Sequence, residues 1–351
     1  MVRARRSGQR FTAAVRAKAP TPVVPDIGTI LIASIEERWR RFQAQLRRTR
    51  RSGSEGSVHD LRVAMRRLMA TVDMIRTIIP DEGLQKTRRS LRKHLKGFNQ
   101  LRDTHIQILA LRRLAREFPP LRPLGTELRR REAKLMRASR GTIRSINPPH
   151  LERSLADASV RLGALLRLPG VRDVAGATAM GAMGAAFARA FELRQQVNPG
   201  DPASIHRLRV VFKKCRYMVE VLRPLLPGVD ERFLKSLDAY QTRMGEVQDM
   251  GVIMATVNSF TLHSRYAPTL SLVPVQQRLA QMRKDRIDEF LRHADELYGL
   301  WEAARAEPGR PSSRAGVGRR SRRPGTGAGV SVRRRPRQAG ARRHPATRPR
   351  G

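Results

Sequence analysis

The sequence lacks several features on which whole classes of protein depend. A single cysteine, Cys215, occurs in 351 residues, so no intramolecular disulfide forms and a reducing compartment is compatible. Because Cys215 falls among regularly spaced apolar residues, we expect a packed core thiol and not a nucleophile. No uninterrupted apolar run is long enough for a membrane span, and the N-terminus lacks the apolar core of a secretory signal. We therefore expect a cytoplasmic protein.

Acidic residues are scarce as well. The chain has 71 Lys and Arg against 30 Asp and Glu, which gives a net charge of +41. Residues 1–25 and 308–351 contain no acid, and residues 26–307 still carry +21. A folded body with this much self-repulsion is typical of a protein that holds an anion: nucleic acid, a membrane surface or a polyphosphate. The alternative is a basic protein whose charge serves only solubility.

Both ends of the chain are rich in basic residues and prolines and poor in apolar residues. We expect residues 1–25 and 306–351 to be disordered basic tails, because they have too little apolar surface to fold alone. One interpretation of the second tail is a basic arm for nucleic acid. The other is a GC-rich gene read out of frame at its 3′ end, so no function is assigned to this tail.

Between the tails, over residues 26–305, the apolar residues recur at helical spacing without a run of period two. This pattern predicts an all-α body whose helices are separated by Pro-, Gly-, Asn- and Asp-rich turns. Asp201-Pro202 is a helix cap followed by a first-turn proline, and Ser57 with Asp60 forms a capping-box pattern. The expected helices are 28–51, 57–79, 84–117, 121–145, 151–167, 171–197, 202–226, 230–263 and 272–304.

Two parts of this body resemble each other. The stretch "SVHDLRVAMRRLMATVDMIRTIIP" (57–80) aligns without a gap with "SIHRLRVVFKKCRYMVEVLRPLLP" (204–227), and the apolar positions of both form a core-facing stripe. The likeness continues from 91–106 to 237–252. We infer an internal duplication, with repeat one at about 27–146 and repeat two at about 150–303.

Basic residues form the stripe next to the apolar one in both copies, spaced by about one helical turn, roughly 5.4 Å. A solvated helix face would usually mix Glu with Lys, but Asp73 and Glu220 are the only acids on these stripes. Since the same basic face occurs twice, we expect the two helices to enclose one shared channel. The basic residues are His59, Arg62, Arg66 and Arg76 in one copy, and His206, Arg209, Lys213, Arg216 and Arg223 in the other.

One pair of motifs occurs twice in the sequence. The first helix of the pair opens with His-x-x-Arg-x-x-x-basic-basic, and the helix after it ends near Leu-Gly-x-x-Arg-Asp. This pattern resembles the CHAD family, the conserved histidine α-helical domain, over about residues 27–303. The resemblance implies two pseudosymmetric four-helix bundles, a central basic channel that binds inorganic polyphosphate, and association with polyphosphate granules. With Arg216 from the basic stripe, the candidate polyphosphate-binding residues are His59, Arg62, Arg66, Arg67, Lys93, Lys96, His206, Arg209, Lys213, Lys214 and Arg216.

The sequence departs from the family pattern at Asn99, where Gly is expected, and at Gln248, which replaces the Arg seen at Arg102. Sequence motifs of known catalytic sites are missing. There is no P-loop, and there is no Glu-x-Glu-x-Lys motif of the triphosphatase domains often fused to this family. The remaining histidines are not spaced as zinc ligands are. We therefore expect a binding protein without a catalytic residue, cofactor or metal.

Nucleic-acid binding without sequence specificity is the main alternative. Single-strand binders usually interleave stacking aromatics with cations, and helices that read a groove use Asn or Gln beside Arg. The two basic stripes have neither, and aromatics make up 5% of the chain. Polyphosphate needs only Arg forks and Lys charges against its oxygens, so it is preferred. A docking role for the helix with "AMGAMGAAFARAF" is a third possibility, although bundle packing explains that helix more simply.

Because neither tail has an apolar pattern, residues 26–307 should fold alone as a mostly helical protein and keep polyphosphate binding. Circular dichroism and a polyphosphate titration of this truncated protein check both points. Loss of helix or of binding would show that the domain boundaries are wrong.

Overall fold

The computed structural model describes residues 26–263 and 272–305, and in these residues it contains helices and no β-strand. The all-α fold is therefore confirmed. Short 3-10 turns follow two of the helices, at Pro119–Leu121 and Arg223–Leu225. The α-helices are α1 (Ile27–Ser52), α2 (Glu55–Ile78), α3 (Glu82–Gly97), α4 (Asn99–Glu117), α5 (Arg122–Arg144), α6 (Pro148–Leu165), α7 (Val171–Gln195), α8 (Pro202–Leu222), α9 (Glu231–His263), α10 (Val273–His293) and α11 (Glu296–Arg305).

The starts of the two basic helices follow from local capping. At α8 the Asp201 carboxylate accepts a hydrogen bond from the Ala203 N–H at 3.0 Å, and Pro202 lies in the first turn, as the sequence predicts. The capping box predicted at Ser57 is wrong. Helix α2 begins earlier, at Glu55, because the Ser54 hydroxyl accepts from the Ser57 N–H at 3.3 Å.

Two of the predicted helices are interrupted. The segment predicted at 84–117 forms α3 and α4, which meet at the fully buried Phe98. The segment at 272–304 forms α10 and α11, and in this break the Ala294 carbonyl accepts a hydrogen bond from the buried Tyr240 hydroxyl at 2.9 Å. Apolar spacing continues across both breaks, so periodicity alone did not reveal them.

The main hydrophobic core contains helices from both repeats. It packs α1, α2, α3 and α6 against α7, α8, α11 and the beginning of α9. Phe212 of α8 and Tyr240 of α9 lie in this core with their ring centroids 4.7 Å apart. Cys215 is fully buried there, and burial raises the pKa of its thiol to about 12. The predicted core thiol is confirmed.

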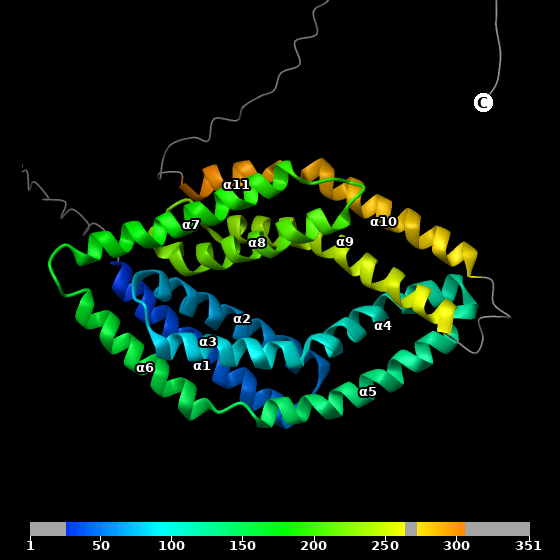
Figure 1. Ribbon diagram of the computed structural model, residues 1–351, viewed down its shortest axis with the longest axis horizontal. Coiled ribbons are helices and arrows are strands. Elements are labelled where there is room, and N and C mark those ends of the chain that lie inside the picture. The colour runs from blue at the N-terminus through cyan, green and yellow to red at the C-terminus, as the bar shows by residue number, and fades with distance from the viewer. Residues whose placement is uncertain (1–25, 264–271, 306–351) are drawn as a thin grey trace, which may run out of the picture. The chain divides into compact units, whose positions relative to one another are not determined.

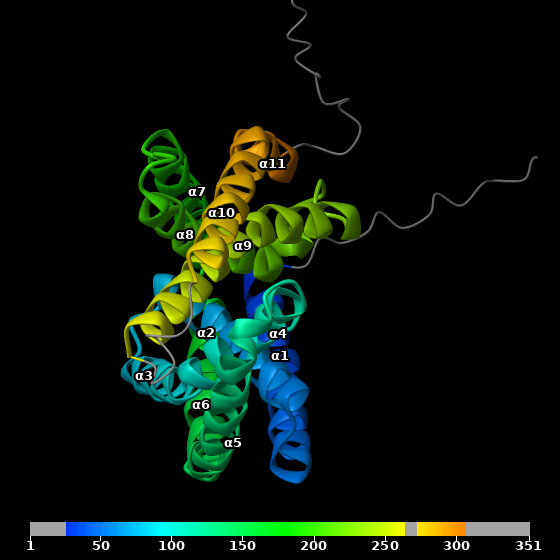
Figure 2. The same ribbon diagram turned by 90° about the vertical axis from the view of Figure 1, so that its right-hand side faces the viewer.

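A second core also joins the repeats. Helices α4 and α5 of the first repeat pack on the end of α9 and the beginning of α10, at the right of Figure 1 and again together in Figure 2. Leu111 and Leu124 meet Val257 and Leu279 in this core. The helices thus pack across the repeats and not only within each of them, which fixes the two basic helices relative to one another.

Helix α7 contains the Ala- and Gly-rich stretch. It is the one helix among the described residues whose length and composition would allow a membrane crossing, with a mean hydropathy of 1.2, a test that core helices also pass. It packs against α8, α2 and α1. Phe187 lies against Trp301 of α11 with ring centroids 4.7 Å apart, and the same indole passes close to Gly184. Buried alanines of α7 such as Ala179 and Ala186 therefore serve close helix packing, whereas open space lies over Gly176 and Gly181.

Candidate anion-binding site

The two basic helices, α2 and α8, contact each other, and the repeated basic residues meet at this contact. Arg62 and Arg66 of α2 lie near Arg209 and Lys213 of α8, so the structure brings four of the predicted site residues together. Arg102 from the first turn of α4 joins them. We call Arg62, Arg66, Arg102, Arg209 and Lys213 the cationic cluster.

The members of the cationic cluster are held out of water next to one another. Burial and, after it, the charges of Arg66, Arg209 and the other two arginines together lower the pKa of Lys213 to about 7. Burial also lowers the pKa of Arg62, to about 9, with Arg66 and Arg102 contributing. The charges of Arg62 and Lys213 are therefore costly in the free protein, because these groups have lost hydration and face like charges.

Each repeat supplies a carboxylate that acts on its own arginine. Asp103 of α4 favours the charged form of Arg62, and Asp249 of α9 favours that of Arg209. These two aspartates occupy equivalent positions in the duplicated segments. Burial raises the pKa of Asp249, which Arg102 and Arg209 counteract. The charges of the cluster thus follow the internal repeat, with two carboxylates acting on five cations.

The two repeats differ in how they hold the equivalent arginines. Arg62 is 3% exposed, and its guanidinium donates to the Leu95 carbonyl and to Asn99 Oδ1, both at 3.2 Å. In the second repeat the position of Asn99 is Gly245, and the Arg209 guanidinium lies directly over it. The Nε of Arg209 is buried without a hydrogen-bond partner. Arg62 is partly satisfied by protein oxygens, whereas the buried Nε of Arg209 is not.

A groove of about 210 Å³ opens beside the cluster between α2 and α4. Arg62 and Arg102 line it, and so does His59, whose side chain is exposed. His59 is therefore placed in the wall of the same groove as the two arginines. The equivalent His206 is exposed on α8 and does not line this groove.

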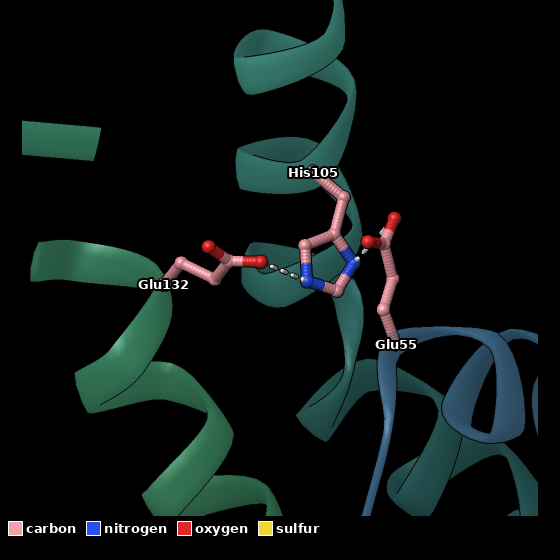
Figure 3. A group of neighbouring side chains, drawn as sticks. All are labelled: Glu55, His105 and Glu132. Carbon is pink, nitrogen blue, oxygen red and sulfur yellow. Dashed lines mark ion pairs between the residues drawn. The ribbon is translucent and has the colours of Figure 1, made fainter. Parts of the chain in front are cut away.

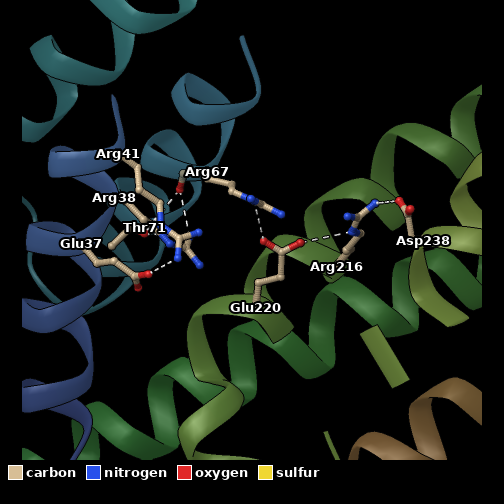
Figure 4. Close-up of polar contacts among 8 residues, drawn as sticks. All are labelled: Glu37, Arg38, Arg41, Arg67, Thr71, Arg216, Glu220 and Asp238. Atoms are coloured by element: carbon tan, nitrogen blue, oxygen red, sulfur yellow. Dashed lines mark hydrogen bonds and ion pairs between the residues drawn. The ribbon is translucent and has the colours of Figure 1, made fainter. Parts of the chain in front are cut away.

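Arg67 and Arg216 lie in ion pairs on the other side of the α2–α8 contact (Figure 4). Both contact the same carboxylate, that of Glu220: Arg67 Nε at 3.1 Å and Arg216 Nε at 3.2 Å. Arg216 also pairs with Asp238. Because Arg67 belongs to α2 and Glu220 to α8, this network ties the repeats together. An anionic ligand would compete with these carboxylates for the two arginines.

The remaining candidates lie on the surface. Lys93 and Lys96 of α3 and Lys214 of α8 are exposed, and within the described residues none of them is among the charges that act on the cationic cluster. The predicted site residues did not include Arg102, although it belongs to the Arg-Asp motif of the family pattern. They also did not include Tyr217, a half-buried tyrosine that acts on Arg66 and Arg209. Tyr217 has Ala70 as its counterpart in the first repeat, so the duplication gave no signal for it.

The structure also groups one histidine with two acids from separate helices (Figure 3). His105 Nδ1 lies 3.5 Å from Glu55, and its Nε2 lies 3.2 Å from Glu132. Each ring nitrogen faces a different carboxylate across the ring. The three side chains offer ligand atoms that lie within 4.8 Å of one another, a spacing at which such a group could hold a metal ion. The group joins α2, α4 and α5 beside the groove.

Comparisons with known proteins were made for sequence and for fold. No curated protein matches the sequence. Among solved structures, the crystal structure of the CHAD domain from the plant Ricinus communis is similar, with a TM-score of 0.55 and 15% sequence identity. The likeness covers 80% of this chain and 92% of that one. PptA from Streptomyces chartreusis has a TM-score of 0.47 at 15% identity, over 79% of this chain and 100% of that one.

The family comparison covers most of the described body. The CHAD domain pattern matches residues 33–258, which contain α2, α4, α8 and every member of the cationic cluster. The match is to well over half of the 351 residues, and the Ricinus structure has the same fold. The chain therefore belongs to the CHAD domain family.

Proposed function

We propose that the cationic cluster binds inorganic polyphosphate and that the protein is a polyphosphate-binding protein, without catalytic activity, that associates with polyphosphate granules. The observation that carries this proposal is the meeting of five cations from α2, α4 and α8, where Asp103 acts on Arg62 and Asp249 acts on Arg209. A polyanion would supply the counter-charge that the protein lacks there. Arg forks suit phosphate oxygens, which they bind in bidentate fashion.

The placement of the cluster favours a thin, flexible polyanion over a duplex. Its members are buried or half-buried between helices, where a chain of phosphates fits and a DNA duplex is too wide to enter. Tyr217, the aromatic residue that acts on the cluster, is half-buried and approaches as a polar group. Single-stranded nucleic acid would instead call for exposed aromatic faces on which bases stack.

A competition titration tests this function directly. Long-chain polyphosphate should displace labelled polyphosphate at a lower phosphate concentration than duplex DNA, single-stranded DNA, RNA or pyrophosphate, all measured at one salt concentration. The affinity should fall with salt, because each engaged phosphate releases counterions. If nucleic acid displaces polyphosphate at equal phosphate concentration, the protein is a nucleic-acid binder.

The two equivalent arginines should respond differently to substitution. Arg209→Ala should weaken polyphosphate binding by about ten- to a hundredfold, because a charge-assisted contact contributes about 1.5–3 kcal/mol. Arg62→Ala should also weaken binding, but in addition it should lower the free energy of unfolding by about 1–3 kcal/mol, since the Leu95 carbonyl and Asn99 lose their donor. Titration and thermal melting of both variants separate the two effects.

Arg112→Ala is the control for this pair, because Arg112 is exposed on α4 away from the cluster. It should change the affinity little, since an exposed charge acts through a screened field. Normal binding by a folded Arg209→Ala variant would place the polyphosphate site elsewhere.

The pH dependence of binding should come from Lys213. In the free protein its pKa is lowered to about 7, and a bound polyanion would raise that pKa because it favours the charged form. Affinity should therefore be nearly constant below pH 7 and fall between pH 7 and 8, by up to about tenfold for one linked proton. Titrations of the wild type at several pH values measure this fall.

Lys213→Gln should remove the fall in affinity, whereas Lys214→Gln, a change of the same charge at the exposed neighbouring position, should keep it. The same pH dependence in the Lys213→Gln variant would assign the titration to another group.

A further inference from the structure

A second basic groove lies between α1 and α2, on the side of α2 where Arg67 points. It has a volume of about 280 Å³. Arg38 and Arg41 of α1 line it together with Arg67 of α2, and Asp60 is the one acid in its wall. Three guanidinium groups from two helices therefore border one small concave surface (Figure 4).

Arg38 is the fixed element of this groove. It is 8% exposed, and its Nη1 donates to the Arg67 carbonyl at 3.0 Å and to the Thr71 hydroxyl at 2.9 Å. These partners hold the guanidinium in place but carry no charge. Among the described residues, no carboxylate forms an ion pair with Arg38, and burial lowers its pKa to about 10. Glu220 and Glu37 favour the charged form of Arg38 from a distance, but burial outweighs them, so an anion in the groove would add counter-charge.

The carboxylates near the groove are already engaged by other arginines. Asp60 pairs with Arg48 at 3.0 Å. Glu37 pairs with Arg41 at 2.5 Å, on the exposed side of α1. Glu220 pairs with Arg67 from the side of α8. These pairs also engage Arg41 and Arg67, so Arg38 is the groove arginine that keeps neutral hydrogen-bond partners among the described residues.

We propose that this groove is a second anion site, which takes a phosphate group of a polyphosphate chain already held by the cationic cluster. The proposal rests on the proposed function. Arg66 and Arg67 are neighbours on α2: Arg66 belongs to the cluster, and Arg67 lines the groove. A chain that crosses α2 meets both. Long chains then reach the groove, and chains that fill only the cluster do not.

The second repeat does not offer the same site. By order in the chain, α7 corresponds to α1, and residues 174–188 of α7 contain no Lys or Arg. The bound chain would therefore extend toward α1 and not toward α7.

The test compares two exposed arginines on the same helix. Arg41→Gln changes the groove, and Arg47→Gln makes the same change of charge at a residue that does not line it. Arg41→Gln should lower the affinity for long-chain polyphosphate by about three- to tenfold, as a partly exposed charge contact allows, and leave that for tripolyphosphate unchanged. Arg47→Gln should leave both affinities within about twofold, because its charge is screened.

Gln45→Glu is the second variant, since Gln45 lines the groove and its Oε1 is buried without a hydrogen-bond partner. The new carboxylate has nearly the same shape and would neutralise Arg38 or Arg41. It should lower long-chain affinity selectively, without a loss of thermal stability. Unchanged long-chain affinity in this variant would overturn the proposal.

The outcomes separate the groove from the main site. If the wild type binds neither polyphosphate, the proposed function is wrong. If it binds both and the two arginine variants lose affinity equally, the function stands and the groove is no site. Equal losses for tripolyphosphate and long chains in Arg41→Gln would show that Arg41 acts on the cluster and that the chain does not extend over α2.

Discussion

The structure depends on holding five like charges together where α2 meets α8. Repulsion among Arg62, Arg66, Arg102, Arg209 and Lys213 drives the repeats apart, and their burial removes the water that would screen it. Two features oppose this force. The repeats share both hydrophobic cores, so separating α2 from α8 would expose apolar surface at two places. In addition, Glu220 of one repeat pairs with Arg67 of the other directly behind the cluster. The apolar packing therefore stabilises an arrangement of charges that is unfavourable in itself.

This arrangement explains why some basic residues of the two helices are available to a ligand and others are not. Position on the helix decides which. Arg66 faces the cluster, while the next residue, Arg67, faces Glu220 and the α1 groove. Arg216 is held between Glu220 and Asp238, so its charge is spent within the protein. A stripe of cations on one helix thus divides into residues that pair with carboxylates and residues that face other cations, according to what the neighbouring helix brings opposite each of them.

The sequence was sufficient for the parts of this arrangement that are local or repeated. Helical periodicity placed α2 and α8, and the likeness of the two segments singled out Arg62, Arg66, Arg209 and Lys213, which lie together where these helices meet. Contacts that depend on the register between helices were out of reach. Nothing in the spacing predicted that Glu220 would reach Arg67, or that Phe98 would break a helix by entering the core. The position of Tyr217 is Ala70 in the first repeat, so the likeness gave no signal for the tyrosine, and the Arg-Asp motif gave none that Arg102 acts on cations of both helices.

The two repeats differ in sequence, so the two halves of the cationic cluster are not equivalent. At Asn99 the first repeat has gained an acceptor that holds Arg62, whereas Gly245 leaves the equivalent arginine with a free donor. Arg102 has become Gln248 in the second repeat, so one arginine serves both halves of the cluster. Outside the cluster, α1 carries Arg38 and Arg41 where α7 carries small uncharged residues. As a result, more positive charge is held in place in the first repeat. The donor without a partner, Arg209 Nε, belongs to the second repeat. A polyanion, which has no direction of its own along a uniform chain, would therefore meet two chemically different ends of one site.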